Sequence, residues 1–148
     1  MINFNWYPFS NLSVEQLYAV LALRSEVFVV QQNCVYLDPD GKDIFALHLL
    51  GQEKNSLVAY LRLFPPTDTE NFIIFGRVLT AGSSRKKGYG KKLIQGLLDY
   101  CNANYPGITI KCSAQHYLKK FYEEFGFQAY GDPYEEEGIL HIAMERNA

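Results

Sequence analysis

The sequence predicts an α/β fold with a mixed sheet that contains one parallel pair of strands near its middle. Residues 72–79 form an apolar run rich in β-branched and aromatic side chains, residues 93–101 carry apolar side chains at helical spacing, and residues 108–113 form another short apolar run. These three patterns are typical of a buried strand, an amphipathic helix and a second strand. Because a helical crossover joins parallel strands, we expect these two strands to run in the same direction.

The N-terminal residues predict a strand followed by a helix. Residues 3–7 alternate polar and apolar side chains, as in a half-buried strand. Ser13 and Gln16 then match a capping box, in which each side chain bonds the backbone N–H of the other residue. Helical spacing continues to about Phe28 along an apolar stripe: Val14, Leu17, Tyr18, Leu21 and Phe28. Arg24 lies off this stripe.

The rest of the chain predicts a hairpin before the central strand and a helix with two strands at the end. Residues 29–43 contain proline, glycine and acids and predict a long loop. Apolar residues 45–50 and 57–64 predict an antiparallel hairpin. Towards the C-terminus, residues 118–125 keep helical spacing, and Gly126 is placed to end that helix. The sheet is then completed by strands near 127–130 and 139–145, on either side of Asp132-Pro133.

Length and composition restrict the class of protein. The chain has 148 residues, a net charge of −2 and 48% hydrophobic residues, which predicts one domain over residues 1–148 without general attraction to nucleic acid. Three cysteines without C-x-x-C spacing predict neither a disulfide framework nor a zinc site. No apolar stretch approaches the ~20 residues of a membrane span, and no signal peptide is evident. We therefore expect a cytoplasmic protein that binds neither nucleic acid nor membrane.

Residues 85–90, Arg-Lys-Lys-Gly-Tyr-Gly, lie directly before the predicted crossover helix. Glycines let successive backbone N–H groups turn toward one anion, and a helix N-terminus and three basic side chains add to the attraction. A Walker A loop requires Gly-Lys-Ser/Thr, and a Rossmann fingerprint requires a third glycine where the chain has Leu93, so both fail. The stretch predicts a pyrophosphate-binding loop; an ordinary glycine turn with a solvated basic surface is the alternative.

This R-x-x-G-x-G loop, with its preceding strand and following helix, resembles that of the GCN5-related N-acetyltransferases (GNAT). Residues 121–127, Phe-Tyr-Glu-Glu-Phe-Gly-Phe, match the F-Y-x-x-x-G-F ending of the same family. The segments LRSEVFVVQQNCVYLDPDGKD and Gly138-Ile139-Leu140-His141-Ile142 resemble the ElaA-like branch, so the similarity spans nearly the whole chain. It implies a single GNAT acetyltransferase domain: an α/β GNAT fold whose mixed, mostly antiparallel sheet has a central splayed parallel strand pair and is flanked by helices.

The resemblance also implies acetyl-CoA as co-substrate and no metal. In the family, the strand before the loop pairs with the pantetheine arm, and the loop holds the pyrophosphate. Gln115 stands where the family often has an asparagine that contacts the cofactor. The residues assigned to acetyl-CoA in this way are Val78, Leu79, Thr80, Arg85, Lys86, Lys87, Gly88, Tyr89, Gly90, Lys91, Gln115 and Tyr122.

Acetyl transfer by direct attack on the thioester produces an oxyanion and expels a thiolate. A backbone N–H of the central strand, assigned to Leu79, can donate to the oxyanion, and loss of such a donor typically costs ~3 kcal/mol in the barrier. Tyr122 can protonate the leaving sulfur as general acid, since a phenol is protonated near neutral pH. From the residues alone, a core tyrosine on an apolar helical stripe is the favoured interpretation of Tyr122, and it is the match to the F-Y-x-x-x-G-F motif that favours the general acid instead.

The acceptor and its base are less well defined by the sequence. The central strand contains no acid, so a base that acts through water is expected. Candidates for acceptor contacts are Asp40 and Asp43, whose charge would attract a cationic amine, and the histidines His48 and His141. Each also has a plainer interpretation, as a solvated acid or a structural histidine.

The sequence leaves two main classes of function open. One is an N-acetyltransferase that acts on a primary amine of a small molecule or a peptide, and the other is a non-catalytic acetyl-CoA-binding sensor or regulatory module. Nucleic-acid binding on the basic run is the weakest alternative. The acceptor, the general base and any preference for another acyl-CoA stay open, and a homodimer is compatible with the sequence.

Overall fold

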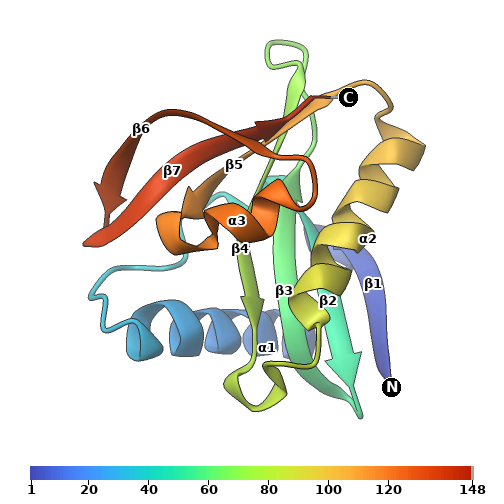
Figure 1. Cartoon of the computed structure of the whole chain (residues 1–148). Coiled ribbons are helices and arrows are strands. Elements are labelled where there is room, and N and C mark those ends of the chain that lie inside the picture. The colour runs from blue at the N-terminus through green and yellow to red at the C-terminus, as the bar shows by residue number, and fades with distance from the viewer. Residues whose placement is uncertain (148) are drawn as a thin grey trace.

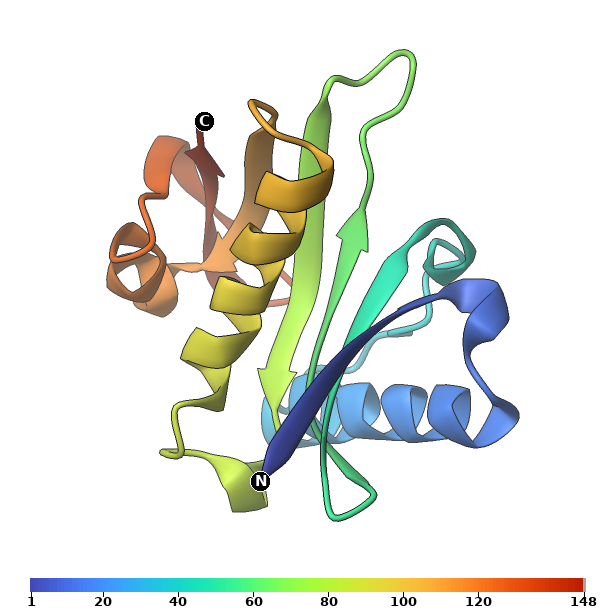
Figure 2. The same cartoon turned by 90° about the vertical axis from the view of Figure 1, so that its right-hand side faces the viewer.

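The computed structural model describes residues 1–147. Its strands form one mixed seven-stranded sheet in the order β1-β2-β3-β4-β5-β7-β6. Helices α2 and α3 cover one face of the sheet, and α1 lies on the other (Figures 1 and 2). The strands are β1 (Ile2–Pro8), β2 (Leu47–Glu53), β3 (Ser56–Phe64), β4 (Phe72–Thr80), β5 (Thr109–Gln115), β6 (Gln128–Glu136) and β7 (Ile139–Arg146). The helices are α1 (Val14–Arg24), α2 (Tyr89–Asn104) and α3 (Lys119–Glu123).

Strands β4 and β5 are the parallel pair, and they separate soon after they meet. Their register contains only Phe72↔Thr109, Ile73↔Ile110 and Ile74↔Lys111, although β4 continues to Thr80 and β5 to Gln115. All other neighbouring strands are antiparallel. The predicted mixed sheet with a central splayed parallel pair is therefore confirmed.

A β-bulge lies in β4 where this separation begins. Opposite β3, the register moves from Tyr60↔Leu79 to Arg62↔Gly76, so β4 contains one extra residue. Arg77 at the bulge has a φ of 51°, in the left-handed region that non-glycine residues rarely adopt. A bulge bends its strand and increases the local twist, which here turns the end of β4 away from β5.

Helix α2 makes the crossover from β4 to β5, as its apolar stripe predicts. Leu93, Ile94, Leu97 and Cys101 are buried in the core, and Gly88 with a φ of 78° precedes the helix. The crossover places the N-terminus of α2 beside the end of β4 (Figure 2). Among the helices of residues 1–147, none is both long and apolar enough to cross a membrane.

The buried face of α1 differs from the predicted one. Val14 and Tyr18 are 82% and 78% exposed, whereas Val20, Leu23 and Arg24 are buried. The helix begins with the predicted Ser13 capping box, but it continues beyond Arg24 as the π-helix η2 (Ser25–Gln31). The predicted stripe is therefore only partly right, since its other members, Leu17, Leu21 and Phe28, are half-buried. Arg24, which was expected to lie off the stripe, is buried because its charge is paired: its guanidinium lies 2.8 Å from Asp38 and 2.7 Å from Asp43.

The C-terminal part also differs in detail. Helix α3 has only five residues, after a 3-10 turn, instead of the expected 118–125, but Gly126 with a φ of 87° does follow it. Strand β6 runs through Asp132-Pro133 to Glu136, where an interruption was expected, with an irregular register between Tyr130 and Tyr134. Glu137 and Gly138, both with positive φ, form the turn into β7. The long β6–β7 hairpin reaches toward the loop after α1 (Figure 1).

Arg24→Met should destabilise the protein by about 3–5 kcal/mol, because it leaves buried carboxylates without one of their partners. Urea unfolding measures the loss, with Lys120→Met on the exposed surface as the matched control that changes stability by less than about 0.5 kcal/mol. Equal stability of the two variants would show that the ion pairs of Arg24 do not hold α1 to the loop.

Candidate active site

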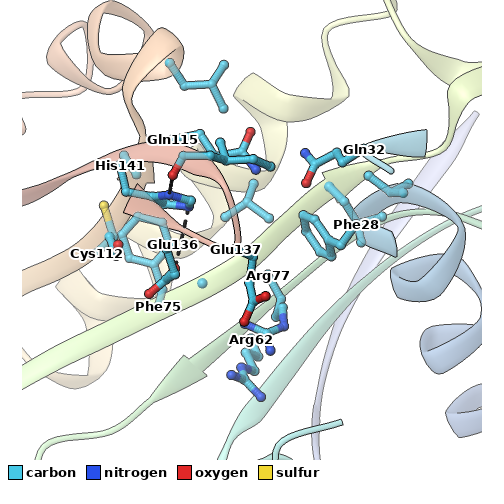
Figure 3. A pocket seen from close by; sticks show the side chains of 18 of the residues that line it. Phe28, Gln32, Arg62, Phe75, Arg77, Cys112, Gln115, Glu136, Glu137 and His141 are labelled. Atoms are coloured by element: carbon cyan, nitrogen blue, oxygen red, sulfur yellow. Dashed lines mark hydrogen bonds and ion pairs between the residues drawn. The ribbon is translucent and has the colours of Figure 1, made fainter. Parts of the chain in front are cut away.

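A cleft of about 890 Å³ opens where β4 leaves β5. Its walls come from the β4 and β5 strands, from η2 with the loop that follows, from α3, and from the turn between β6 and β7. Figure 3 shows Phe28 and Gln32 on one side of this cleft and Gln115, His141 and Glu136 on the other. The cleft therefore joins segments that are far apart in the sequence.

The end of β4 presents backbone groups to this cleft. Ala81 donates its N–H to the carbonyl of Val58 at 2.7 Å, so this residue faces β3. Because backbone groups alternate along a strand, the N–H of Leu79 also points to β3, whereas those of Val78 and Thr80 point to the side that β5 has left. This corrects the assignment of an oxyanion donor to Leu79, whose N–H is directed to the neighbouring strand.

The loop before α2 presents a second set of backbone donors. Lys86 and Gly88 both have a positive φ, 68° and 78°, and no side chain caps the helix. The first hydrogen bond of the helix runs from the N–H of Lys92 to the carbonyl of Gly88, at 3.2 Å. The N–H groups of Tyr89, Gly90 and Lys91 thus have no acceptor within the helix, and such groups at the positive end of a helix dipole bind anions.

The side chains of this loop are not all free to meet an anion. Tyr89 is buried and donates its hydroxyl to Glu53, and Lys87 lies 3.5 Å from the same carboxylate. Arg85 lines the cleft and donates to Gln31 of η2 at 2.6 Å. Lys86, Lys87 and Lys91 are exposed, and none of them is among the residues that line the cleft. Tyr89 can therefore contribute its backbone N–H, but its side chain supports the loop.

Tyr122 lies on α3 at the inner end of the cleft. It is 4% exposed, and its ring packs against Phe75 and Phe127 with centroids 6.0 and 5.9 Å away. No side chain or backbone group of residues 1–147 pairs with its hydroxyl, yet that oxygen is not among the fully enclosed unpaired atoms. Burial raises the pKa of Tyr122 above its ordinary value, so the phenol keeps its proton near neutral pH.

Cys112 also lines the cleft, from strand β5. Burial raises the pKa of its thiol to about 12. Because the thiolate is the nucleophilic form, this cysteine is unreactive near neutral pH. The site therefore does not favour a covalent intermediate on Cys112.

Three arginines and three aspartates form an ion-pair network along one wall of the cleft. In addition to the pairs of Arg24, Arg62 lies 2.6 Å from Asp40 and 2.9 Å from Asp43, and Arg77 lies 2.9 Å from Asp38. The hydrogen bond from Arg62 holds the pKa of Asp40 well below its usual range. Burial alone would raise the pKa of Asp43, but the bond from Arg24 keeps it below its ordinary value.

This network corrects the expectation that Asp40 and Asp43 attract a cationic acceptor. Asp40 does line the cleft, but both of its oxygens accept hydrogen bonds from Arg62. Asp43 is paired with Arg24 and Arg62, is buried at 8% exposure and does not line the cleft. Their function in the structure is to hold the loop after η2 against α1, β3 and the bulge at Arg77. The sequence showed the acids but gave no sign of their arginine hydrogen-bond partners, which lie 19 to 22 residues away.

The two candidate histidines have different surroundings. His48 is fully buried, and its ring nitrogens lie 2.6 Å from the hydroxyl of Tyr60 and 2.9 Å from the carbonyl of Asp43. Burial lowers its pKa, and it does not line the cleft, so its expected contact with an acceptor is wrong. His141 does line the cleft, opposite Gln115 in the β5–β7 register.

Several cleft residues had no signal in the sequence. Arg77 reaches the cleft because of the bulge, which no local pattern indicated. Glu136 and Glu137 belong to an acidic run whose charge could be expected to attract a cationic amine, but the length of β6 that brings them to the cleft was not expected. Gln31 ends a π-helix and Gln32 caps it, in a segment that was expected to be a loop. Within residues 1–147, no group of three or more His, Cys, Asp and Glu side chains is arranged to hold a metal ion.

Comparison with known proteins agrees with this geometry. Residues 46–148 match the family model described as "Acetyltransferase (GNAT) domain". Protein ElaA of Escherichia coli K12 is 40% identical over 148 residues, which cover 99% of this chain and 97% of ElaA. The crystal structure of E. coli ElaA has a TM-score of 0.92 at 39% identity, covering 99% of this chain and 100% of that one.

Two further crystal structures share the fold. An acyl-CoA N-acyltransferase from Pseudomonas aeruginosa has a TM-score of 0.94 at 34% identity, covering 99% of both chains. An aminoglycoside 6′-N-acetyltransferase complexed with coenzyme A has a TM-score of 0.72, covering 97% of this chain and 96% of that one. At 14% identity the latter shows likeness of fold alone.

The chain belongs to the GNAT family of acyltransferases. Within that family it is ElaA-like, with similarity over nearly its full length.

The stability of the protein should fall in acid because the folded state lowers the pKa of Asp40 and Asp43. Below the unfolded value of about 3.9 the unfolded chain binds more protons than the folded one. The stabilisation is therefore fully present above about pH 5, begins to fall near pH 4, and is lost as pH falls on through the lower pKa values of the folded state. Urea unfolding of wild type and Asp40→Asn at several pH values should give a difference in stability that shrinks in acid. A difference that stays constant with pH would contradict this assignment.

Proposed function

We propose that the protein is an acetyl-CoA-dependent N-acetyltransferase that transfers the acetyl group to a primary amine of a small molecule or a peptide. The observation that carries this proposal is the sequence of groups along one cleft. The free N–H groups at the N-terminus of α2 match the diphosphate of an acyl-CoA. The unpaired edge of β4 matches the amides of its pantetheine arm, and the phenol of Tyr122 matches its sulfur.

The N-terminus of α2 would hold the pyrophosphate through the N–H groups of Gly88 to Lys91, with Arg85, Lys86 and Lys87 adding positive charge. The pantetheine arm carries amides, which can pair with the exposed backbone of Val78 and Thr80 as an added strand would. Gln115 lines the cleft and offers an amide to the same arm. The aminoglycoside 6′-N-acetyltransferase of similar fold has been crystallised with coenzyme A, which supports the proposal that this fold can bind an acyl-CoA.

At the inner end of the cleft, the chain offers a donor for each charge that acetyl transfer creates. The N–H of Val78 is directed away from β3 and would donate to the oxyanion; it replaces the N–H of Leu79 in this role. Tyr122 would give its proton to the departing sulfur. Because the Cys112 thiol stays protonated, the amine would attack the thioester directly.

The acceptor would enter from the side of η2 and the β6–β7 turn. Glu136 and Glu137 line this side of the cleft and are exposed, so their charge can raise the local concentration of a cationic amine. A module that only senses acetyl-CoA would not need an unpartnered phenol at the inner end of the cleft, so we favour the enzyme.

Gly90→Asp should weaken acetyl-CoA binding without unfolding the protein. A Cβ at this position meets Phe121 at an ordinary 3.7 Å, and an acidic side chain in the first helical turn stabilises the helix. Its charge should repel the pyrophosphate and lower affinity about 10-fold or more relative to Gly90→Asn, the neutral control, which corresponds to ~1.4 kcal/mol. Calorimetry with acetyl-CoA measures both variants; equal affinities at low salt would contradict a pyrophosphate at this position.

Tyr122→Phe should lower kcat by about 10²–10⁴-fold, the usual contribution of a general acid, and leave the affinity for acetyl-CoA nearly unchanged. The hydroxyl has no protein partner among residues 1–147, so its removal leaves no buried group unpaired. Release of coenzyme A from acetyl-CoA with a panel of primary amines measures the rate. Tyr18→Phe on the exposed face of α1 is the control. Full activity in Tyr122→Phe would remove Tyr122 from the mechanism.

A further inference from the structure

We propose that His141 is the base that removes the proton from the acceptor amine, and that Glu136 stabilises the imidazolium that results. This inference rests on the N-acetyltransferase activity proposed above. Such a base is needed because a primary amine is an ammonium ion near neutral pH and cannot attack until it loses a proton. Strand β4 contains no carboxylate to supply one, since Arg77 is its charged residue.

The hydrogen bonds of the His141 ring leave one nitrogen available. Nδ1 lies 2.7 Å from the backbone carbonyl of Ile139. A carbonyl only accepts hydrogen bonds, so Nδ1 carries the hydrogen and donates it. In the neutral imidazole, Nε2 then holds a lone pair and can accept a proton.

Packing from three strands fixes the orientation of this ring. In the register, His141 of β7 lies opposite Gln115 of β5 and Tyr134 of β6. The rings of Tyr134 and His141 are stacked, with centroids 6.1 Å apart and an angle of 22° between their planes. The hydroxyl of Tyr134 is in turn hydrogen-bonded to Ser113 of β5. A ring held at one nitrogen and on one face can turn little, so Nε2 keeps a constant direction.

Glu136 is placed to stabilise the charge that His141 would gain. Its Oε2 lies 3.6 Å from Nε2, too far for a direct hydrogen bond, so Glu136 does not occupy the Nε2 lone pair (Figure 3). At this distance the carboxylate charge would stabilise the positive charge that the ring gains in the reaction, and its 58% exposure gives the released proton a way to solvent. The other groups beside the ring are Tyr134 on β6 and the uncharged Ser113 and Gln115 on β5, while Glu137 follows on the turn.

The other candidates for this base are less suitable. Both ring nitrogens of His48 are occupied, and His116 is not among the residues that line the cleft. Asp40 is held by both of its oxygens to Arg62. Of the chain's three histidines, His141 is therefore the one that lines the cleft with a free nitrogen.

The proposed step balances in atoms and charge. The ammonium gives one proton to Nε2 of His141, directly or through a water, and the freed lone pair forms the C–N bond as the carbonyl electrons move to oxygen. The intermediate collapses, the C–S bond breaks, and the sulfur takes the proton of Tyr122. The amide nitrogen then gives its second proton to the Tyr122 oxygen, which restores the phenol. His141 releases its proton to solvent beside Glu136. The products are the amide, coenzyme A and one proton.

The test uses His141→Asn, whose side-chain amide can still donate to Ile139 but lacks Nε2. Wild type and variant are assayed with acetyl-CoA and a panel of polyamines, amino acids and peptides, using the amine that wild type acetylates fastest. Near neutral pH, kcat/KM should fall about 10²–10⁴-fold, and it should recover toward the wild-type value at alkaline pH, where the free amine needs no base. The affinity for acetyl-CoA should not change.

Glu136→Gln should lower the rate about 2- to 5-fold, and the control His116→Asn should leave it unchanged.

A wild-type pH profile in His141→Asn, or an equal loss of rate at every pH, would overturn the inference, because a purely structural role does not depend on the protonation of the amine. Nitrogen-detected NMR that shows the hydrogen on Nε2 instead of Nδ1 would overturn it as well. If wild type itself releases no coenzyme A with any amine, the proposed function fails and this inference fails with it. An active wild type with an unchanged variant overturns only the role of His141.

Discussion

The early separation of β4 from β5 is the constraint on which the site depends. A central strand normally has its backbone groups paired on both sides, but beyond Ile74 one side of β4 has no neighbouring strand. Unpaired backbone groups cost about 1–3 kcal/mol each when they are buried away from water, so this edge must remain open to solvent or to a ligand that can pair with it. The bulge at Arg77 bends β4 away, and the cleft provides that opening. The open edge of β4 is thus created by interrupting the sheet rather than by adding a loop to it.

The ion-pair network makes this interruption stable. Arg77, in its left-handed conformation at the bulge, donates to both the side chain and the backbone carbonyl of Asp38, and Arg24 binds the same side chain from α1. The loop that carries Asp38 therefore connects the bulge in β4 to helix α1. Buried charges destabilise a fold unless they are paired. The stability of each charge in the network of three arginines and three aspartates therefore depends on the presence of its partners. The π-helix η2 that leads into this loop forms a wall of the same cleft.

Local patterns predicted the elements whose environment is local, and failed where distant residues decide the structure. The apolar stripe of α2 and the strand before it were predicted correctly because spacing determines them, although the helix already begins at Tyr89, within the stretch 85–90 that was expected to precede it. The buried face of α1 was predicted only in part, since Arg24 reads as a surface residue until Asp38 and Asp43 are seen beside it. Likewise, the direction of the Leu79 N–H depends on the β3 register, and the route of β6 through Pro133 depends on its pairing with β7. Both are long-range facts that a sequence pattern does not contain.

A crystal structure with bound acetyl-CoA would test most directly whether the open edge of β4 binds the cofactor. The proposed function predicts the pyrophosphate on the N–H groups of Gly88 to Lys91 and the pantetheine amides paired with Val78 and Thr80. It also predicts the thioester sulfur within hydrogen-bond distance of the Tyr122 hydroxyl. An acetyl-CoA molecule bound elsewhere on the protein, or β4 and β5 paired along their whole length with the cleft closed, would contradict it.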